Sequence, residues 1–261
     1  ALLAMATFES LFVGTAIGFA TSALLVLSTR LPATEGEVHV DGAVVHSVRD
    51  RIMVGMRRFG HVAELRALLA LNVVVACATS FVMVNTPVIV KDAFGRSSLQ
   101  VALALAAYGA GSMLVALTLP RILDRTSDRR VMLFAASLVA PLLAATWAVL
   151  ALLPDDSAWH VMLAIWFLAG GAASMMLTPA GRLLRRASTD ADRTAVFAAQ
   201  FSLSHLCFLV TYPVAGWVGS LTSPATAAAC LAVVAGAGAL AAREQWSRQD
   251  RHQASPSTSA A

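Results

Sequence analysis

The stretch from Leu99 to Val131 constrains the fold more than any other part of the sequence. It begins with about twenty residues that carry no formal charge, LQVALALAAYGAGSMLVALTLP, and continues directly into RILDRTSDRR. This second segment holds four arginines and two aspartates, and another long uncharged run, VMLFAASLVAPLLAATWAVLALL, follows at once. Two apolar runs that are each long enough to cross ~30 Å of hydrocarbon, joined by a short basic loop, predict two membrane helices connected on the cytoplasmic side.

The composition indicates a polytopic α-helical membrane protein. Of the 261 residues, 58% are hydrophobic and 13% are charged, whereas a soluble domain averages about 25% charged residues. The apolar residues also come in runs that are too long for the core of a soluble protein. The alternation with a period of two residues that a membrane barrel requires is absent from the sequence.

The same composition excludes several function classes. A net charge of +4 does not indicate a nucleic-acid partner, because the basic residues sit in short loops between apolar spans rather than on one soluble face. The three cysteines, Cys77, Cys207 and Cys230, fall inside apolar spans without metal-ligand spacing. We therefore expect neither a disulfide framework nor a metal or other cofactor. The sequence motifs of P-loop nucleotide binding, zinc proteases and serine hydrolases are absent, so we predict no enzyme activity and no direct use of ATP.

Seven apolar segments are long enough to cross a membrane. Their approximate bounds are 11–29, 67–90, 99–120, 131–153, 158–180, 195–218 and 223–242. Residues 1–10 either open the first span or end a preceding one, and in the second case Glu9 lies in an outer turn. The sequence begins at Ala1 with no basic segment ahead of the first apolar run. We therefore expect no signal peptide, and we expect the chain to be a fragment.

Lysine and arginine residues set the predicted orientation. Seventeen of the 19 lie in the segments 30–66, 121–130 and 181–194 and in the C-terminal tail, whereas the loops 154–157 and 219–222 have none. Basic and basic-free loops thus alternate, as the positive-inside rule requires. We predict a multi-pass protein of the plasma membrane with a cytoplasmic C-terminus and an N-terminus on or near the outer side.

Segment 30–66 is the only long loop, and we interpret it as a cytoplasmic linker. Its second half carries Ile52, Met56, Phe59 and Ala63 at helical spacing, with arginines off that face. This pattern predicts a basic amphipathic helix on the inner leaflet. The predicted domains are a membrane helix over 1–29, the linker over 30–66, a six-helix bundle over 67–242 and a disordered cytoplasmic tail over 243–261.

The basic loop after residue 120 resembles a motif of the major facilitator superfamily. In that family a pattern like G-x-x-x-D-R-x-G-R-R lies between the second and third helices of each six-helix bundle. The segment 120–130 matches this pattern at Asp124, Arg125, Arg129 and Arg130, while Pro120 and Ser127 stand at the two glycine positions. The segment 84–125 is especially similar to bacterial members that export drugs and metabolites.

The resemblance implies an all-α membrane protein with a major-facilitator-like helical bundle of about seven transmembrane helices. On this interpretation the first helix closes a missing N-terminal helical bundle, and the other six form the C-terminal bundle. The missing bundle and the lipid bilayer are then partners of this chain, and the implied location is the bacterial inner membrane.

The basic loop also has a physical role that is independent of the family. A carboxylate and a guanidinium at a helix end pair with each other and cap a neighbouring helix. Asp124 and Arg125, with Arg129 and Arg130, are therefore predicted to form a latch that gates the cytoplasmic side. The alternative is that these charges only set the topology.

Polar residues inside the spans are the candidates for a substrate cavity, because polar groups in a membrane are costly. The spans 131–153 and 223–242 have no Asn, Gln, His or charged residue, and the resemblance implies that these two helices face lipid while the other four line the cavity. The alternative for each candidate is a hydrogen bond between helices. The candidates are Asn72, Asn85, Tyr108, Trp166, Gln200, Ser204, His205 and Thr211.

The span 195–218 carries polar residues on two faces. Gln200, Ser204, Cys207 and Thr211 share one face, and His205 and Tyr212 share another. One face is expected to meet the cavity and the other to pack on a neighbouring helix.

Two residues are candidates for proton coupling. His205 near mid-membrane can titrate and relay a proton, or it can be a packing residue. Glu9 is the only acid that could lie within a span, and its alternative position is the outer interface.

These observations predict a secondary active transporter that works by alternating access. Aromatic and amide groups with few charges favour small amphipathic organic molecules or drugs as substrates, and the resemblance implies that these are exported in exchange for protons. Its remaining partners are therefore a small-molecule substrate and protons, with no nucleic acid. The alternative function is a transport-inactive membrane scaffold or a truncated assembly partner.

Overall fold

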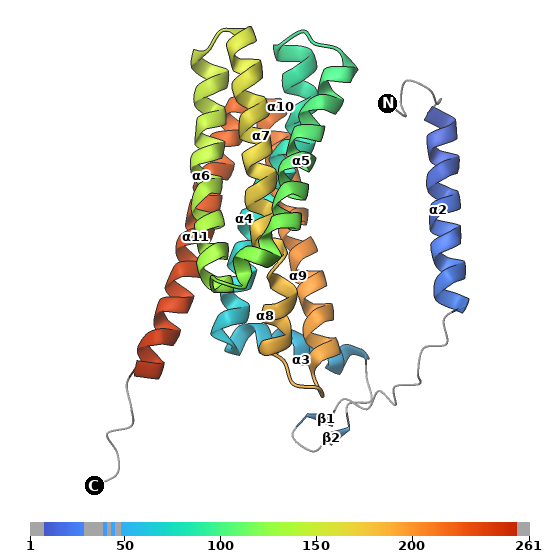
Figure 1. Ribbon diagram of the computed structural model, residues 1–261, viewed down its shortest axis with the longest axis vertical. Coiled ribbons are helices and arrows are strands. Elements are labelled where there is room, and N and C mark those ends of the chain that lie inside the picture. The colour runs from blue at the N-terminus through green and yellow to red at the C-terminus, as the bar shows by residue number, and fades with distance from the viewer. Residues whose placement is uncertain (1–7, 29–38, 41–42, 45–47, 255–261) are drawn as a thin grey trace. The chain divides into compact units, whose positions relative to one another are not determined.

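The computed structural model describes residues 8–28, 39–40, 43–44 and 48–254. The chain divides into two compact units, Ala1–Val38 and His39–Ala261, and each is described by itself. The first unit contains helix α2 (Phe8–Ser28). The second contains all the other elements (Figure 1).

Helix α2 is apolar along its length, and Glu9 is the one charged residue in its sequence. Its described apolar part, Val13–Leu25, is shorter than the other membrane helices. The hydroxyl of Thr21 donates to the carbonyl of Ile17 at 2.8 Å, which satisfies a polar group within the helix itself. The side chain of Glu9 lies outside the described residues, so its role in proton coupling stays a prediction.

The second unit is a bundle of six helices that are long and apolar enough to cross a membrane. A short antiparallel pair, β1 (His39–Val40) and β2 (Ala43–Val44), and helix α3 (Val48–His61) precede them. The six are α4 (Ala63–Val88) with the π-helix η1 (Ile89–Ala93), α5 (Ser98–Leu123), α6 (Asp128–Leu152), α7 (Asp155–Leu177) with α8 (Ala180–Arg186), α9 (Arg193–Pro213) with the π-helix η2 (Val214–Val218) and α10 (Gly219–Leu221), and α11 (Pro224–Ala254).

The predicted fold class is confirmed. Each of the six predicted spans between residues 67 and 242 corresponds to one of these helices, and α2 adds the shorter apolar helix. The arginine-bearing segments, namely the turn between α5 and α6, helix α8 and the last turns of α11, lie toward the same end of the bundle, the lower end in Figure 1. We call this end the basic end.

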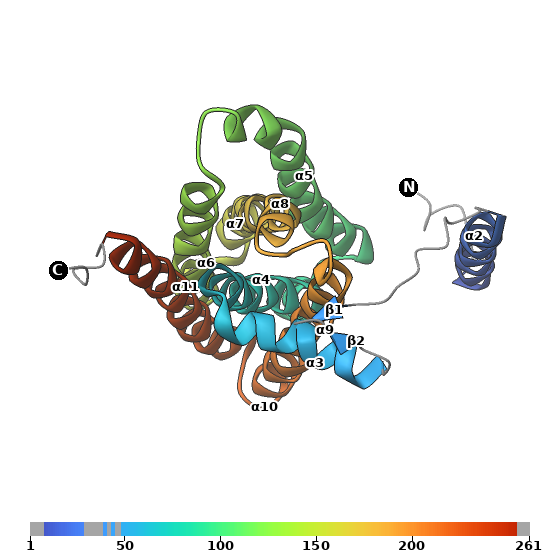
Figure 2. The same cartoon turned by 90° about the horizontal axis from the view of Figure 1, so that it is seen from below.

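Helix α4 lies at the centre of the bundle. Seen from the basic end, it packs against α11, α9, α6, α7 and α5 (Figure 2). Its side chains are correspondingly buried, and Leu65, Leu68 and Phe81 are at most 1% exposed. Burial of most of this helix agrees with its apolar sequence, and its buried polar residues must bond to neighbouring helices.

Helices α5 and α7 approach each other at two glycines. A Cβ atom at Gly111 would lie 1.8 Å from the carbonyl oxygen of Phe167, and one at Gly170 would lie 1.9 Å from that of Tyr108. Only glycine permits these contacts between backbones. The crossing leaves the other face of α5 exposed, including Leu103, Met113 and Leu117.

The start of α5 is set by local hydrogen bonds. Gly95, with φ of 60°, turns the chain after η1. Ser97 then donates its backbone N–H to the side-chain oxygen of Gln100 at 2.7 Å, which completes a capping box at the helix N-terminus.

The amphipathic helix expected in segment 30–66 is α3, and its contact with the inner leaflet stays a prediction. Phe59 is buried, whereas Met56 is 38% exposed. Gly55 is also buried, because a Cβ there would lie 2.2 Å from the backbone oxygen of Ala195 in α9. The need for a close approach between backbones, rather than apolarity alone, therefore orients this helix.

The predicted disorder of the tail 243–261 is wrong for its first part, because α11 continues as a helix to Ala254. Three observations explain why this segment is helical. Trp246 is 2% exposed, Arg66 donates to the side chain of Gln245 at 2.9 Å, and Arg129 pairs with Asp250 at 2.7 Å. Residues 255–261 lie outside the described part, and the other predicted domain boundaries stay predictions.

Candidate functional site

Polar residues along α4 bond to α9 at three levels. The side-chain amides of Asn72 and Gln200 form two reciprocal hydrogen bonds, both 3.1 Å long. The hydroxyls of Ser80 and Thr211 lie 2.7 Å apart. Asn85 donates its amide to the backbone oxygen of Ala215 in η2 at 3.2 Å. Two of the candidate residues on α9 thus face α4.

Two further polar residues of α4 bond to α5 and α7. The hydroxyls of Thr79 and Tyr108 lie 3.0 Å apart. The indole N–H of Trp166 donates to the hydroxyl of Thr86 at 2.7 Å, and Thr86 donates in turn to the carbonyl of Val82. The ring of Phe81 meets Trp166 edge-on at 6.0 Å between centroids. Each polar group in this part of the apolar bundle therefore has a partner.

Six of the eight cavity candidates make these interhelical contacts. Their geometry matches the alternative of hydrogen bonds between helices, and contact with a substrate stays a prediction for them. They are Asn72, Asn85, Tyr108, Trp166, Gln200 and Thr211. Ser204 and His205 differ, because both side chains bond to the backbone of their own helix, at the carbonyl of Phe201.

A different face of α9 carries a row of aromatic rings, which we call the aromatic row: Phe201, His205, Phe208 and Tyr212. Successive ring centroids lie 4.1, 6.5 and 5.7 Å apart. Phe201 and Tyr212 are 66% and 40% exposed, and His205 is exposed. Nδ1 of His205 donates to the carbonyl oxygen of Phe201 at 2.7 Å, so Nε2 is the nitrogen that accepts a proton.

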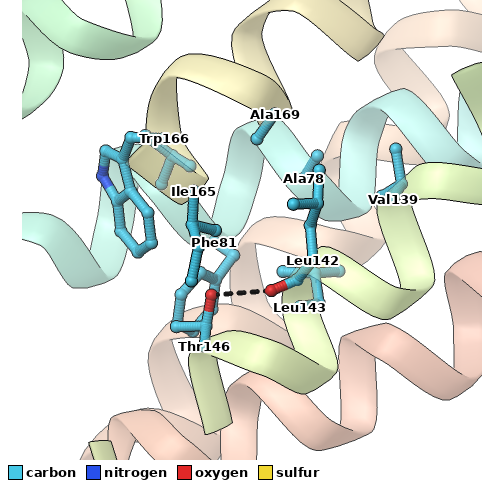
Figure 3. Close-up of a pocket in the computed structure, with 10 residues that line it drawn as sticks. Ala78, Phe81, Val139, Leu142, Leu143, Thr146, Ile165, Trp166 and Ala169 are labelled. Atoms are coloured by element: carbon cyan, nitrogen blue, oxygen red, sulfur yellow. Dashed lines mark hydrogen bonds between the residues drawn. The ribbon is translucent and has the colours of Figure 1, made fainter. Parts of the chain in front are cut away.

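A small apolar cavity lies between α4, α6 and α7 (Figure 3). Its volume is ≈ 10 Å³, and Phe81, Ile165 and Trp166 are among the side chains that line it. The hydroxyl of Thr146 donates to the carbonyl of Leu142 at 2.9 Å and leaves no polar group to hold a ligand there. A space of this size is near the lower limit for one water molecule, so it is a packing gap and not a substrate site.

Asp128 is the most buried carboxylate at the basic end. Its side chain is 4% exposed and lies 2.6 Å from Arg186 and 3.8 Å from Arg182, both in α8. As the first residue of α6, it also lies at the positive end of the helix dipole. The ion pair therefore connects the start of α6 with α8.

Arg129 connects the same turn with α11. It pairs with Asp250 at 2.7 Å and lies over the ring of Trp246 at 5.7 Å from the centroid.

The four predicted latch residues have different environments. Arg129 makes the contacts just described, whereas Asp124, Arg125 and Arg130 are exposed. Within the described part of the chain, none of these three forms an ion pair. Asp124 is the C-cap residue that follows the last residue of α5. The buried acid of this turn is Asp128, which the sequence pattern did not single out.

A third connection at the basic end joins α3 to α9. Arg58 pairs with Asp192, whose side chain is 6% exposed. Thr189 donates both its backbone N–H and its hydroxyl to Asp192, at 2.7 and 2.8 Å. Burial raises the pKa of the Asp192 carboxyl, but the hydrogen bonds from Arg58 and Thr189 outweigh burial and hold the pKa below its usual value.

Among the described residues, no group of three or more His, Cys, Asp or Glu side chains is arranged to hold a metal ion. The described polar features of the bundle include interhelical hydrogen bonds, an exposed aromatic row and three ion-pair sets that connect different helices at the basic end.

The comparison with protein-family models decides the family. The model described as Major Facilitator Superfamily matches residues 68–260. The chain belongs to the Major Facilitator Superfamily. As a superfamily member with six membrane-length helices, it is a multi-pass membrane protein and a transporter rather than an enzyme. No curated protein and no solved structure matches the chain.

Sequence reasoning missed the polar partners Thr79, Ser80 and Thr86 in α4 and two buried acids at the basic end of this superfamily bundle. Asp128 and Asp192 lie at helix N-termini, where the helix dipole favours a carboxylate. This position is the sequence signal that could have identified them. Their partners Arg186 and Arg58 come from separate helices, which local sequence patterns do not identify.

Proposed function

We propose that the chain forms one bundle of a secondary transporter that exports small amphipathic organic molecules in exchange for protons. The observation that carries the proposal is the aromatic row on α9, which is exposed on a face separate from the one that bonds to α4. Coupling to protons, export and the substrate class all depend on this face.

The cost of polar groups in a membrane argues that lipid does not cover the aromatic row. Ionisable side chains within membrane helices almost always face a bundle interior or a water-filled cavity. His205 lies near the middle of the span Arg193–Leu221, and its Nε2 is the nitrogen free to take up a proton. A cavity lined by this face gives that nitrogen access to water and to the substrate.

A second helical bundle is the partner that completes such a cavity. The exposed faces of α5 and α9 are apolar and include Leu103, Leu114, Phe201 and Leu209, which are at least 50% exposed. Small residues on α5, Ala102, Ala106 and Ala110, are exposed on the same helix. Small residues of this kind let another helix approach closely and rearrange, as alternating access requires.

The lining chemistry favours lipophilic substrates. The aromatic row offers ring faces and edges, a phenol hydroxyl and one imidazole, and it contains no carboxylate or guanidinium. Rings of this kind bind apolar and cationic molecules, whereas a sugar phosphate or a dicarboxylate requires fixed cations.

The test is substrate-dependent proton flux in proteoliposomes that contain the protein from its full reading frame. We expect lipophilic compounds to drive protons in the wild type and His205→Gln to abolish the proton flux. His160→Gln is the matched control, because His160 also bonds to the carbonyl four residues earlier, at 2.8 Å, but lies at the start of α7. If no compound in the panel moves protons, the transporter proposal is wrong and the membrane scaffold becomes the better interpretation. If both histidine variants transport normally, the proton role of His205 is wrong.

A further inference from the structure

A groove of ≈ 560 Å³ runs between α6 and α11 on the outside of the bundle. Its volume falls in the range of sites that hold small molecules, ~300–1,000 Å³. The middle of the groove is apolar and is lined by Leu133, Phe134, Ala140, Gly236 and Leu240. Phe134 and Leu240 are 57% and 68% exposed, so the groove opens on the surface that α6 and α11 present to the membrane.

Two arginines, Arg130 of α6 and Arg243 of α11, line the groove at the basic end. Both side chains are exposed, and neither forms an ion pair with another described residue. The acids nearest in sequence have other partners, since Asp128 pairs with Arg186 and Glu244 pairs with Arg248. The described lining residues include no acid. The groove therefore combines an apolar body with two uncompensated positive charges at one end.

The length of the groove matches one leaflet of a bilayer. From Arg130 to Ala140, α6 rises about 15 Å at ~1.5 Å per residue. The hydrocarbon of a bilayer is ~30 Å thick, and the apolar part from Leu133 to Ala140 rises about 10 Å, so it covers about two thirds of one leaflet. The arginines then lie at the level of the lipid headgroups, where their charge is well solvated.

We infer that this groove binds an anionic phospholipid from the leaflet at the basic end, with its phosphate between Arg130 and Arg243 and an acyl chain between α6 and α11. The inference is independent of the transported substrate and rests on the membrane placement of the six helices. A transport substrate is not the expected occupant, because the groove faces outward on the two helices whose spans 131–153 and 223–242 hold no Asn, Gln, His or charged residue. Basic pockets between membrane helices are suited to anionic headgroups.

The experiment measures lipid binding to the detergent-solubilised, full-length protein by native mass spectrometry. The probes are phosphatidylglycerol and phosphatidylcholine with the same acyl chains. We expect phosphatidylglycerol to bind more tightly than phosphatidylcholine. Arg130→Gln and Arg243→Gln should each weaken phosphatidylglycerol binding about fivefold and together about thirtyfold, without changing phosphatidylcholine binding. Arg130→Lys should retain most of the binding, because it keeps the charge.

Two variants separate the groove from the general positive charge of this end. The matched control is the double variant Arg121→Gln with Arg185→Gln, which removes two exposed arginines of the basic end that lie outside the groove. Gly236→Leu keeps all arginines but fills the apolar part, where a Cβ meets Ala140 at an ordinary 3.7 Å. We expect the control to bind phosphatidylglycerol normally and Gly236→Leu to lose binding. Glycerol phosphate without acyl chains should not compete.

Three results would overturn the inference. The first is equal binding of the two lipids to the wild type. The second is an unchanged affinity of the Arg130→Gln, Arg243→Gln variant for phosphatidylglycerol. The third is an equal loss in the control double variant, which would show attraction to the basic end as a whole. Thermal unfolding without added lipid checks that each variant is folded.

Discussion

The carboxylate of Asp128 in α6 lies 2.6 Å from the guanidinium of Arg186 in α8, and the two partners differ sharply in exposure. The Asp128 side chain is 4% exposed, whereas that of Arg186 is 59% exposed. If the ion pair were broken, water could solvate the exposed guanidinium of Arg186 but not the buried carboxylate of Asp128. The carboxylate therefore depends on this ion pair more than the guanidinium does. The pair fixes α8 against the start of α6 at the basic end of the bundle.

Arg186→Ala should therefore destabilise the bundle by about 1–3 kcal/mol, because it leaves a buried charged group with a weaker partner. The remaining arginine, Arg182, lies 3.8 Å away. Thermal unfolding of the purified protein in detergent measures the effect. The control is Arg185→Ala, which removes an exposed arginine of the same helix without a described ion pair. Equal stability of the two variants would contradict the structural role of the pair.

Asp124→Asn should impair transport while leaving membrane insertion and stability intact. Asp124 is exposed at the C-terminus of α5, so the substitution should hardly change the stability of this conformation. If Asp124 acts as a latch, it does so in another conformation of the transport cycle, and the loss appears only in transport. Substrate flux at equal protein level is the measurement, and unchanged flux would remove the latch hypothesis.

The helices themselves could be predicted from the sequence, because each span is a long uncharged run and the basic loops alternate with basic-free ones. The partners could not be predicted in the same way. Asn72 and Gln200 are 128 residues apart, and only the packing of α4 against α9 brings their amides together. Sequence periodicity separated the two polar faces of α9, but it could not decide which of them packs inward.

One error has a clear physical cause. The polar composition after residue 242 favoured disorder, yet contacts of Trp246 and Asp250 with residues far away in the chain keep the segment helical. Long-range contacts thus outweighed a local preference.

Because α5 and α7 pack closely, we expect Gly111 to be essential for the stability of the bundle and Gly109 to be dispensable. Gly111→Ala should destabilise the bundle by about 1–3 kcal/mol, because the new methyl group would overlap the carbonyl of Phe167. Gly109→Ala is the control, since a Cβ atom there would meet nothing within 4 Å. Thermal unfolding compares the two variants, and similar losses would show that the helices can shift apart at little cost.

The Arg58–Asp192 pair predicts how the docking of α3 depends on pH. The folded state holds the pKa of Asp192 below the usual 3.8, so the carboxylate stabilises the docked helix at all pH values above that. The stabilisation is lost as the pH falls from about 4 through the lower folded pKa. Hydrogen exchange of the amides in 48–61 should therefore speed up below pH 4 after correction for the intrinsic rate. In the Asp192→Asn variant, these amides should exchange faster than in the wild type at neutral pH, and their exchange should not speed up further below pH 4. If the variant shows the same pH dependence of exchange as the wild type, Asp192 does not control the docking of α3.

The amide pair of Asn72 and Gln200 distinguishes a structural role from contact with a substrate. In a double-mutant cycle with Asn72→Ala and Gln200→Ala, we expect a coupling energy of about 0.6–1.7 kcal/mol, the range for hydrogen bonds between membrane helices. The partners exchange two bonds of 3.1 Å, so each single variant should lose nearly as much stability as the double variant. Thermal unfolding in detergent without substrate gives the four stabilities. Additive losses would mean that the two amides act independently, and a substrate contact would then become the better explanation for both residues.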